Sequence, residues 1–297
     1  MQTTTESFAQ RTRQLQDQID AALRQATEFS TGCPARLQEA MQYSLLAPGK
    51  RLRPILVVLA AEACGGTLQQ ALPAACAVEM IHAYSLIHDD LPAMDDDDLR
   101  RGRPTNHKIF GEGLAILAGD ALLTRAFEMV AQEIHPPQLA AKCCAALAQA
   151  AGAAALVGGQ VADLEAETSG GDLRQLESIH ARKTGAMLNV SLRLGALAAG
   201  GTPQQLQALQ EYGQRLGLAF QISDDLLDVH GDEATVGKRV GKDNGRGKLT
   251  FPGLLGVEES RHRAEQLIRE AKQALAPLGT AAEGLEALAQ YVLERDR

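Results

Sequence analysis

The chain has 297 residues, 45% of them hydrophobic, and a formal net charge of −8 at neutral pH. This composition suits a soluble globular protein with a large core, and it lacks the bias of collagen, coiled coils and disordered chains. The acidic balance argues against a general binder of nucleic acid or of anionic membranes, because such proteins carry a basic excess. An anionic ligand must therefore be held by local basic side chains and by metal ions.

The five cysteines have neither zinc-type nor redox spacing, and their odd number leaves no complete disulfide framework. We expect them to be small core residues in a reducing compartment. The first twenty residues are polar and lack the apolar core of a signal peptide. No apolar run is expected to approach the roughly 18 residues that span a bilayer. These features predict a cytoplasmic protein without a membrane span.

The apolar periodicity is helical along the whole chain, because Ala, Leu and Gln dominate and alternating β-branched residues are scarce. The predicted helices cover residues 6–28, 34–47, 54–65, 68–90, 113–134, 138–157, 173–199 and 203–229, and two more follow before the C-terminus. Pro92 is expected to end the fourth helix, and Gly158 and Gly159 the sixth. Residues 92–108 are predicted to form a polar loop, and 230–248 a Gly/Lys loop. Without a disordered linker, the chain is predicted to be one all-α domain, residues 1–297.

An apolar helical run ends in a first group of carboxylates. Asp89 and Asp90 close the predicted helix 68–90, and the aspartates at 95–98 follow shortly after. Crowded carboxylates repel each other unless a hard cation lies among them, and oxygen ligands favour magnesium over zinc or copper. Taken alone, such a run is more often a solvated loop.

A second acidic group weighs against the solvated loop. Asp224 and Asp225 end another apolar helical segment, and Asp228 lies one turn further along. Asp224 and Asp228 share a helix face because they are four residues apart. Two such groups facing each other across a cavity would hold several magnesium ions, which bridge to the oxygens of a diphosphate. The sequence therefore predicts a diphosphate substrate.

Basic residues occur at places that suit a phosphate. Residues 49–54, Gly-Lys-Arg-Leu-Arg-Pro, put three cations at a predicted helix start, although a surface turn is the alternative. Lys183 interrupts an apolar helix, so it needs an anionic partner unless it extends to the surface. His82 lies seven residues before Asp89, on nearly the same helical face. The Gly/Lys loop at 237–248 is a weak phosphate signal by itself.

In the order and separation of these motifs, the chain resembles the trans-isoprenyl diphosphate synthases, most closely the bacterial farnesyl diphosphate synthases, over nearly its whole length. The resemblance implies an antiparallel helix bundle around a central cavity, the isoprenoid synthase fold. It implies a homodimer with three magnesium ions per active site, held by Asp89, Asp95 and Asp224. The implied substrates are isopentenyl, dimethylallyl and geranyl diphosphate.

The resemblance also implies roles for the basic motifs. The diphosphate of isopentenyl diphosphate is expected to contact Gly49, Lys50, Arg53, His82 and Arg101. The site of the allylic carbocation is expected to be lined by Lys183, Thr184 and Gln221. Arg100 should reach the allylic diphosphate, over which Lys238 and Lys248 should close. Leu249 and Phe251 depart from the serine and tyrosine expected in close relatives.

The implied reaction needs no nucleophilic side chain. Magnesium neutralises the allylic diphosphate, with Asp90, Asp225 and Asp228 in support, and the C–O bond ionises in a water-poor pocket. The double bond of isopentenyl diphosphate then attacks head to tail, and a proton is lost to the diphosphate. Two cycles extend five carbons to fifteen, which gives (2E,6E)-farnesyl diphosphate.

Product length is expected to depend on Tyr84, which lies about 7 to 8 Å below Asp89 along the helix axis. Ser85 is closer to the face of Asp89, so Tyr84 must lean across to close the channel; an ordinary core tyrosine is the other interpretation. The main alternative function is a geranylgeranyl diphosphate synthase. A class I terpene cyclase usually mixes Asn, Ser or Thr with Glu in its second metal motif, unlike this chain. A non-catalytic prenyltransferase subunit would have lost motif residues, and none is lost here.

Overall fold

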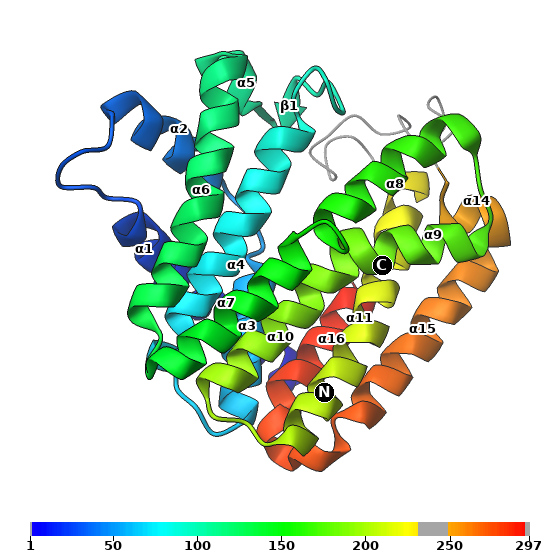
Figure 1. The fold of residues 1–297 in the computed structure, drawn as a ribbon. Helices are drawn as coiled ribbons and strands as arrows, with labels where there is room; N and C mark the ends of the chain where they lie inside the picture. The colour runs from blue at the N-terminus through cyan, green and yellow to red at the C-terminus, as the bar shows by residue number, and fades with distance from the viewer. Residues whose placement is uncertain (1, 231–248, 295–297) are drawn as a thin grey trace.

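A computed structural model describes residues 2–230 and 249–294 of the chain, and its regular structure is almost entirely helical (Figure 1). The helices of the first half are α1 (Gln2–Ala26), α2 (Ala35–Leu45), α3 (Leu52–Ala63), α4 (Leu68–Asp89), α5 (Asn106–Phe110), α6 (Glu112–Glu133) and α7 (Pro137–Ala151). Those of the second half are α8 (Leu156–Ser169), α9 (Leu173–His180), α10 (Ala186–Ala198), α11 (Pro203–His230), α14 (Phe251–Leu255), α15 (Val257–Ala274) and α16 (Glu283–Glu294). A π-helical turn η1 (Ala181–Gly185) and a 3-10 segment η2 (Ala276–Ala282) complete the helical elements among these residues. The all-α prediction is confirmed.

Helix α4 is central to the bundle. It is buried on most of its faces, as expected for a helix that is apolar all round. It packs against α3, α6 and α10, and α3 in turn packs against α10. Thr67 caps its start, because the hydroxyl accepts the Gln70 N–H while the Gln70 side chain accepts the Thr67 N–H. The core therefore fixes the last turns of α4, residues 82–89.

Helix α11 carries the second acidic group to the same end of the molecule. It packs against α10, α15 and α16, and the buried Tyr212 hydroxyl donates to the Leu285 carbonyl at 2.8 Å. The C-terminal ends of α4 and α11 both lie in the upper half of the view in Figure 1. Packing thus directs the two helix ends that carry the aspartate pairs toward the same end of the molecule (Figure 1), although these pairs are far apart in the sequence.

The segment predicted to be a polar loop, 92–108, contains regular structure. Strands β1 (Leu99–Arg100) and β2 (Arg103–Pro104) pair antiparallel, and the short helix α5 follows. The two residues between the strands, Arg101 and Gly102, have φ of 52° and 71°. This is the backbone of a tight two-residue hairpin turn. The loop prediction missed it because each strand is only two residues long.

The predicted helix break at Gly158 and Gly159 is wrong. Helix α7 ends at Ala151, residues 152–155 are not helical, and both glycines lie in the first turn of α8. Their role is close packing: a Cβ at position 159 would lie 2.6 Å from the backbone nitrogen of Lys183. The glycine therefore lets α8 approach η1.

One segment among the described residues, Pro137–Ala166, has the length and composition of a membrane-crossing helix. The sequence-based expectation overlooked this apolar stretch, but the stretch is no clear membrane span in the described residues. The structure divides this segment into parts of α7 and α8, which have 15 and 14 residues and are separated by the non-helical residues 152–155. Each is shorter than the roughly 20 residues that span a bilayer, and α7 packs against α6 and α10.

Candidate active site

A cavity of about 1130 Å³ lies where α4, α11, η1 and the segment before α3 meet. Eight of the residues predicted from the sequence line it: Gly49, Lys50, Arg53, His82, Arg101, Thr184, Gln221 and Asp224. The cavity continues between α1 and α16, where Phe8 and Tyr291 line it. The fold therefore gathers basic and acidic side chains from most of the chain around one space.

The basic loop before α3 is anchored by a buried arginine. Arg51 adopts the left-handed conformation, with φ 48° and ψ 37°. Its guanidinium donates to Asp20 at 2.6 Å, to Glu79 at 2.9 Å and to the Ala47 carbonyl at 3.0 Å. Burial lowers the pKa of Arg51, but Glu79 and Asp20 outweigh burial and raise it overall. The loop is thus tied to both α1 and α4.

Arg53 presents an unsatisfied donor in this cavity. Its Nε atom is buried and has no hydrogen-bond partner among the described residues. Burial lowers the pKa of Arg53, and Arg101 adds to this, whereas Glu79 and Asp224 raise it. A buried N–H without a partner is costly, so the position suits an anion that accepts from it.

Among the side chains expected to bind a diphosphate in this cavity, His82 is uncharged. Burial lowers the pKa of His82 well below its usual value, and the nearby charges of Arg53 and Arg101 lower it further. At neutral pH the imidazole therefore offers one N–H donor and one acceptor. It can bind a phosphate oxygen without adding a further positive charge.

Arg101 and Gly49 fit against each other. Arg101 Nη1 donates to the Pro48 carbonyl at 2.9 Å, and a Cβ at position 49 would collide with the Arg101 guanidinium. The absence of a side chain at Gly49 thus allows the arginine to lie against the loop. This explains physically why glycine precedes the basic residues.

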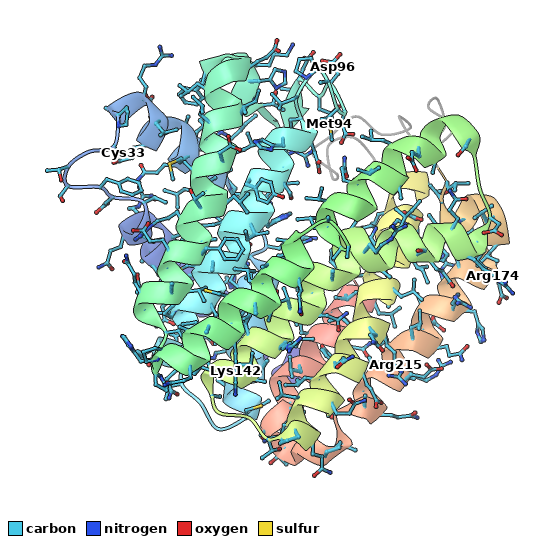
Figure 2. All side chains as sticks on the ribbon, viewed as in Figure 1. Cys33, Met94, Asp96, Lys142, Arg174 and Arg215 are labelled. Atoms are coloured by element: carbon cyan, nitrogen blue, oxygen red, sulfur yellow. The ribbon has the colours of Figure 1, made fainter. Side chains whose placement is uncertain are left out.

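The first acidic group lies at the end of α4. The Asp95 N–H donates to the Asp89 carbonyl at 2.8 Å, and Arg100 pairs with Asp90 at 2.7 Å. Burial raises the pKa of Asp89 to about 6; Asp95 adds to the rise and Lys183 opposes it. Burial likewise raises the pKa of Asp90 to about 6, against the effect of Arg100. The exposed Asp96 lies at the outer edge of the molecule (Figure 2).

The members of the second acidic group have different surroundings. Asp224 lines the cavity, whereas Asp225 is buried and accepts the backbone N–H of Phe251 at 2.8 Å. Phe251 is fully buried and stacks on His180, with ring centroids 5.7 Å apart and planes at 20°. Asp225 thus anchors the start of α14, a contact that spacing along the helix did not predict. Phe251, one of the two departures from the family pattern, occupies a well-packed position.

The π-helical turn η1 interrupts the predicted continuous helix 173–199 and carries Lys183 and Thr184. Such turns are frequent at functional sites because the extra residue changes the direction of the side chains. Lys183 does not extend to the surface: its Nζ pairs with Asp163 on α8 at 2.7 Å, and both side chains are largely buried. Lys183 therefore has an anionic partner within the protein, the Asp163 carboxylate, and its predicted contact with a diphosphate stays a prediction.

Two functional carboxylates were missed in the sequence, Asp163 and Glu79. Glu79 lies in a mainly apolar stretch of α4, where an isolated carboxylate signals a buried partner. Asp163 shares α8 with two glutamates, so no comparable signal marks it in the sequence. Asp163 contacts Lys183 and also raises the pKa of Asp89, so it belongs to the acidic end of the site. Glu79 lines the cavity one turn before His82.

The donor chemistry fits magnesium, although no three His, Cys, Asp or Glu side chains in the described part of the chain lie close enough to form a metal cage. Asp89, Asp95 and Asp224 offer only oxygen ligands, which magnesium prefers. Burial is the main cause of the raised pKa of Asp89, and the negative charge of Asp95 adds to it; a bound cation would favour the charged form of both carboxylates. Magnesium commonly binds through one or two carboxylates plus substrate phosphates, which matches this open arrangement.

The residues predicted to set product length lie beside the acidic end of α4. Tyr84 is 7% exposed and meets the His88 ring edge-on, with centroids 5.5 Å apart. The Ser85 hydroxyl donates to the His82 carbonyl at 2.9 Å. The predicted loop lysines Lys238 and Lys248 lie outside the described residues.

Comparison with known proteins gives consistent matches. Residues 34–283 match the family model described as polyprenyl synthetase. A farnesyl diphosphate synthase of Geobacillus stearothermophilus is 46% identical, over 94% of this chain and 94% of the relative. A geranylgeranyl diphosphate synthase of Cyanophora paradoxa is 48% identical, over 89% of each.

The fold matches solved structures as well. The crystal structure of an FPP/GFPP synthase from Zymomonas mobilis superposes with a TM-score of 0.88 at 38% identity. The alignment covers 97% of this chain and 99% of that one. The whole bundle is thus shared with that structure.

Proposed function

The chain belongs to the polyprenyl synthetase family, and we propose that it condenses isopentenyl diphosphate with dimethylallyl and then geranyl diphosphate, giving (2E,6E)-farnesyl diphosphate. It is a transferase whose relatives include farnesyl diphosphate synthases. The observation that carries the proposal is the cavity in which Arg53, His82 and Arg101 meet Asp224. Anion-binding donors and a magnesium-type carboxylate line one space there, as a transfer between two diphosphates requires.

The second candidate is a twenty-carbon product, geranylgeranyl diphosphate. It is supported by the Cyanophora paradoxa relative, which is as similar in sequence as the farnesyl diphosphate synthases. The fifteen-carbon product is favoured by the buried Tyr84 ring, less than two turns before Asp89 on α4. An aromatic ring at that depth would limit the length of a prenyl tail that runs along α4.

The basic residues bind and orient the acceptor in this proposal. Arg53 and Arg101 offer charged donors to the diphosphate of isopentenyl diphosphate, and neutral His82 adds a further hydrogen bond. Asp89, Asp95 and Asp224 would hold magnesium, which on binding would neutralise the charge of the allylic diphosphate. These groups place the acceptor double bond next to the allylic carbon.

The remaining predicted residues act on the allylic cation and on the diphosphate that leaves it. Thr184 and Gln221 line the cavity beside Asp224, where their dipoles can stabilise the allylic cation as the C–O bond breaks. Lys183 is held by Asp163 near Asp89, so it can contact the departing diphosphate. The new C–C bond forms between this cation and the acceptor double bond. The proton then lost goes to the released diphosphate, so no side chain needs to act as the base.

The decisive variants remove one carboxylate from each acidic group. Asp89→Ala and Asp224→Ala should each lower kcat by orders of magnitude, because each removes a ligand of the metal that neutralises the leaving group. Asp96→Ala, an exposed residue of the same acidic run, is the matched control and should retain activity. Circular dichroism should show unchanged helix content in all three. Near-normal turnover in either of the first two variants would rule out the two-group arrangement.

The assignment of the acceptor site can be tested separately. Arg53→Ala should raise KM for isopentenyl diphosphate far more than KM for the allylic substrate, because it removes a donor from the acceptor cavity. Initial rates measured while each substrate is varied in turn would provide both values. An equal rise for both substrates would refute the assignment.

We also propose a homodimer in the cytoplasm. The support for a dimer is an exposed apolar patch on α5 and α6, formed by Ile109, Ile116 and Leu117, with exposed fractions of 47%, 43% and 56%. An apolar patch of this kind fits an interface with a second copy. The support for the cytoplasm is that all five cysteines are free thiols.

A further inference from the structure

Glu79 stands out among the carboxylates near the cavity because it is buried and belongs to neither acidic group. It lies on α4 one turn before His82 and is 3% exposed. Its Oε1 atom is 2.9 Å from Arg51 Nη1, and both side chains are almost completely buried. Both residues line the same cavity as Arg53 and Arg101. Glu79 is therefore a negative charge placed inside a cavity expected to receive anions.

The negative charge of Glu79 acts on three arginines. It pairs directly with Arg51, and it raises the pKa of both Arg53 and Arg101. These arginines come from the segment before α3, from α3 and from the β1–β2 turn, and their positive charges repel one another. Glu79 is thus a shared counter-charge that allows them to stay close together before a diphosphate arrives.

Arg51 transmits this effect to the loop that binds the diphosphate. Its left-handed backbone lies directly between Lys50 and the first turn of α3, which carries Arg53. The planar guanidinium reaches Asp20 on α1 with one nitrogen and Glu79 on α4 with another. Because this conformation is unfavourable for a residue with a side chain, the two ion pairs are needed to hold it.

We propose that Glu79 is a positioning residue for the acceptor site: by holding Arg51 it orients Lys50 and Arg53 for the diphosphate of isopentenyl diphosphate. This inference rests on the proposed function, but it adds a residue outside the aspartate and basic motifs. Glu79 does not touch the substrate in this account. It acts by organising the basic groups in advance, which reduces the cost of ordering them when the ligand binds.

The isosteric variant Glu79→Gln separates two effects of opposite sign. If Glu79 were only a background charge, its removal would make the cavity more positive, and an anion would bind more tightly. If Glu79 positions the loop, its removal releases Arg51 and weakens binding despite the added positive charge. The direction of the change in affinity therefore decides between the two.

The test is calorimetric titration of the metal-free chain with isopentenyl diphosphate and, separately, with inorganic diphosphate. For Glu79→Gln we expect Kd to rise by about tenfold or more for both ligands. The control is Glu62→Gln on neighbouring α3, which removes a carboxylate that pairs with Arg11 of α1 at the surface, and it should leave both values unchanged. Equal or tighter binding by Glu79→Gln would overturn the inference.

Failure of the inference can be distinguished from failure of the proposed function and from misfolding of the variant. If the unmodified chain binds neither ligand, the proposed function fails, whereas normal binding by the unmodified chain and by Glu79→Gln counts against the inference alone. If Glu79→Gln loses its helical circular-dichroism signal, Glu79→Asp replaces it, because this variant keeps the charge but withdraws the carboxylate by one methylene. Weakened binding by folded Glu79→Asp would support positioning, and unchanged binding would refute it.

Discussion

At the scale of single residues, burial sets the protonation of the site. His82 is neutral at neutral pH because it is desolvated among arginines. Asp89 and Asp90 have a pKa of about 6 because each is desolvated at the end of α4. Without metal, the buried carboxylates of Asp89 and Asp90 are less stable in their charged form than they would be in water, and this lowers the stability of the folded protein.

This cost predicts a dependence of stability on pH. The pKa of Asp89 is about 6 in the folded protein and 3.8 in a free side chain, so between those values the folded state binds the extra proton. The free energy of unfolding therefore falls as the pH rises from about 4 through 6. Asp89→Asn removes this loss. The free energy of unfolding of the variant, relative to that of the unmodified protein, should therefore be about 1 kcal/mol higher at pH 7 than at pH 5, after allowance for partial exposure.

Urea denaturation in the presence of a chelator, at pH 5 and at pH 7, measures this difference. The unmodified chain and Asp89→Asn are compared at each pH, so the titration of all other groups cancels. The same stability difference at both values of pH would show that Asp89 is not desolvated as the structure indicates.

Tyr84 carries the prediction of product length. Tyr84→Ala removes the buried ring close to Asp89 on α4, so the prenyl tail should continue to twenty carbons or more. Tyr84→Phe, which keeps the ring, is the matched control and should still stop at fifteen. Chromatography of the products, formed from the same substrates, measures both. A fifteen-carbon product from Tyr84→Ala would show that another residue, and not Tyr84, limits the length of the prenyl tail.

At the scale of elements, two short pieces of structure place the key side chains. The π-helical turn η1 positions Lys183 against Asp163, and α14 places Phe251 on His180 at the end of α9. Because η1 follows α9 directly, the ring stack supports the turn that carries Lys183. The start of α14 depends in turn on the buried carboxylate of Asp225.

Asp225 therefore has a structural role that can be measured. Asp225→Ala leaves the buried N–H of Phe251 without an acceptor and should cost about 1–3 kcal/mol of stability. Asp225→Asn keeps an acceptor oxygen and should cost much less. Thermal unfolding of the metal-free variants compares the two. If Asn destabilises as much as Ala, the negative charge matters rather than the hydrogen bond.

Long helices were predictable at this scale, and short elements were not. The predicted helix 68–90 agrees with α4, because its apolar run is long and Pro92 follows its end. The break at residues 152–155 was assigned to Gly158 and Gly159, because glycine marks close packing as well as helix ends. The π turn at 181–185 was missed because it continues the helical pattern of its neighbours.

The same distinction holds for the candidate site. The predicted residues that line the cavity, such as Arg53, His82 and Asp224, could be selected because charged and polar residue types are unusual in apolar helices. Glu79 and Asp163 were missed because their partners, Arg51 and Lys183, are distant in the sequence. The contact between Asp225 and Phe251 also depends on tertiary packing, which helix spacing does not reveal.

At the scale of the whole molecule, packing brings two helix ends together. α4 and α11 are separated by much of the chain, yet His82 of one and Asp224 of the other line one cavity. The arrangement depends on the buried contacts of α4 and α11 with α10, which packs against both. The site is thus a property of the bundle rather than of any one motif.

The exposed patch on α5 and α6 predicts the state of assembly. Leu117→Arg places a charge in the proposed interface and should convert a dimer to monomers. Leu254→Arg, which changes an exposed leucine on α14, is the matched control and should leave the dimer intact. Light scattering after size-exclusion chromatography gives the masses. A monomeric unmodified chain would refute the proposed homodimer.

The central claim is that this cavity joins two diphosphate substrates head to tail. The most direct measurement is incubation of the purified chain with isopentenyl and dimethylallyl diphosphate and magnesium, followed by chromatography and mass analysis of the products. We expect geranyl diphosphate as an intermediate and (2E,6E)-farnesyl diphosphate as the main product, with one diphosphate released for each bond formed. A mainly twenty-carbon product would support the geranylgeranyl alternative, and no chain elongation at all would contradict the account.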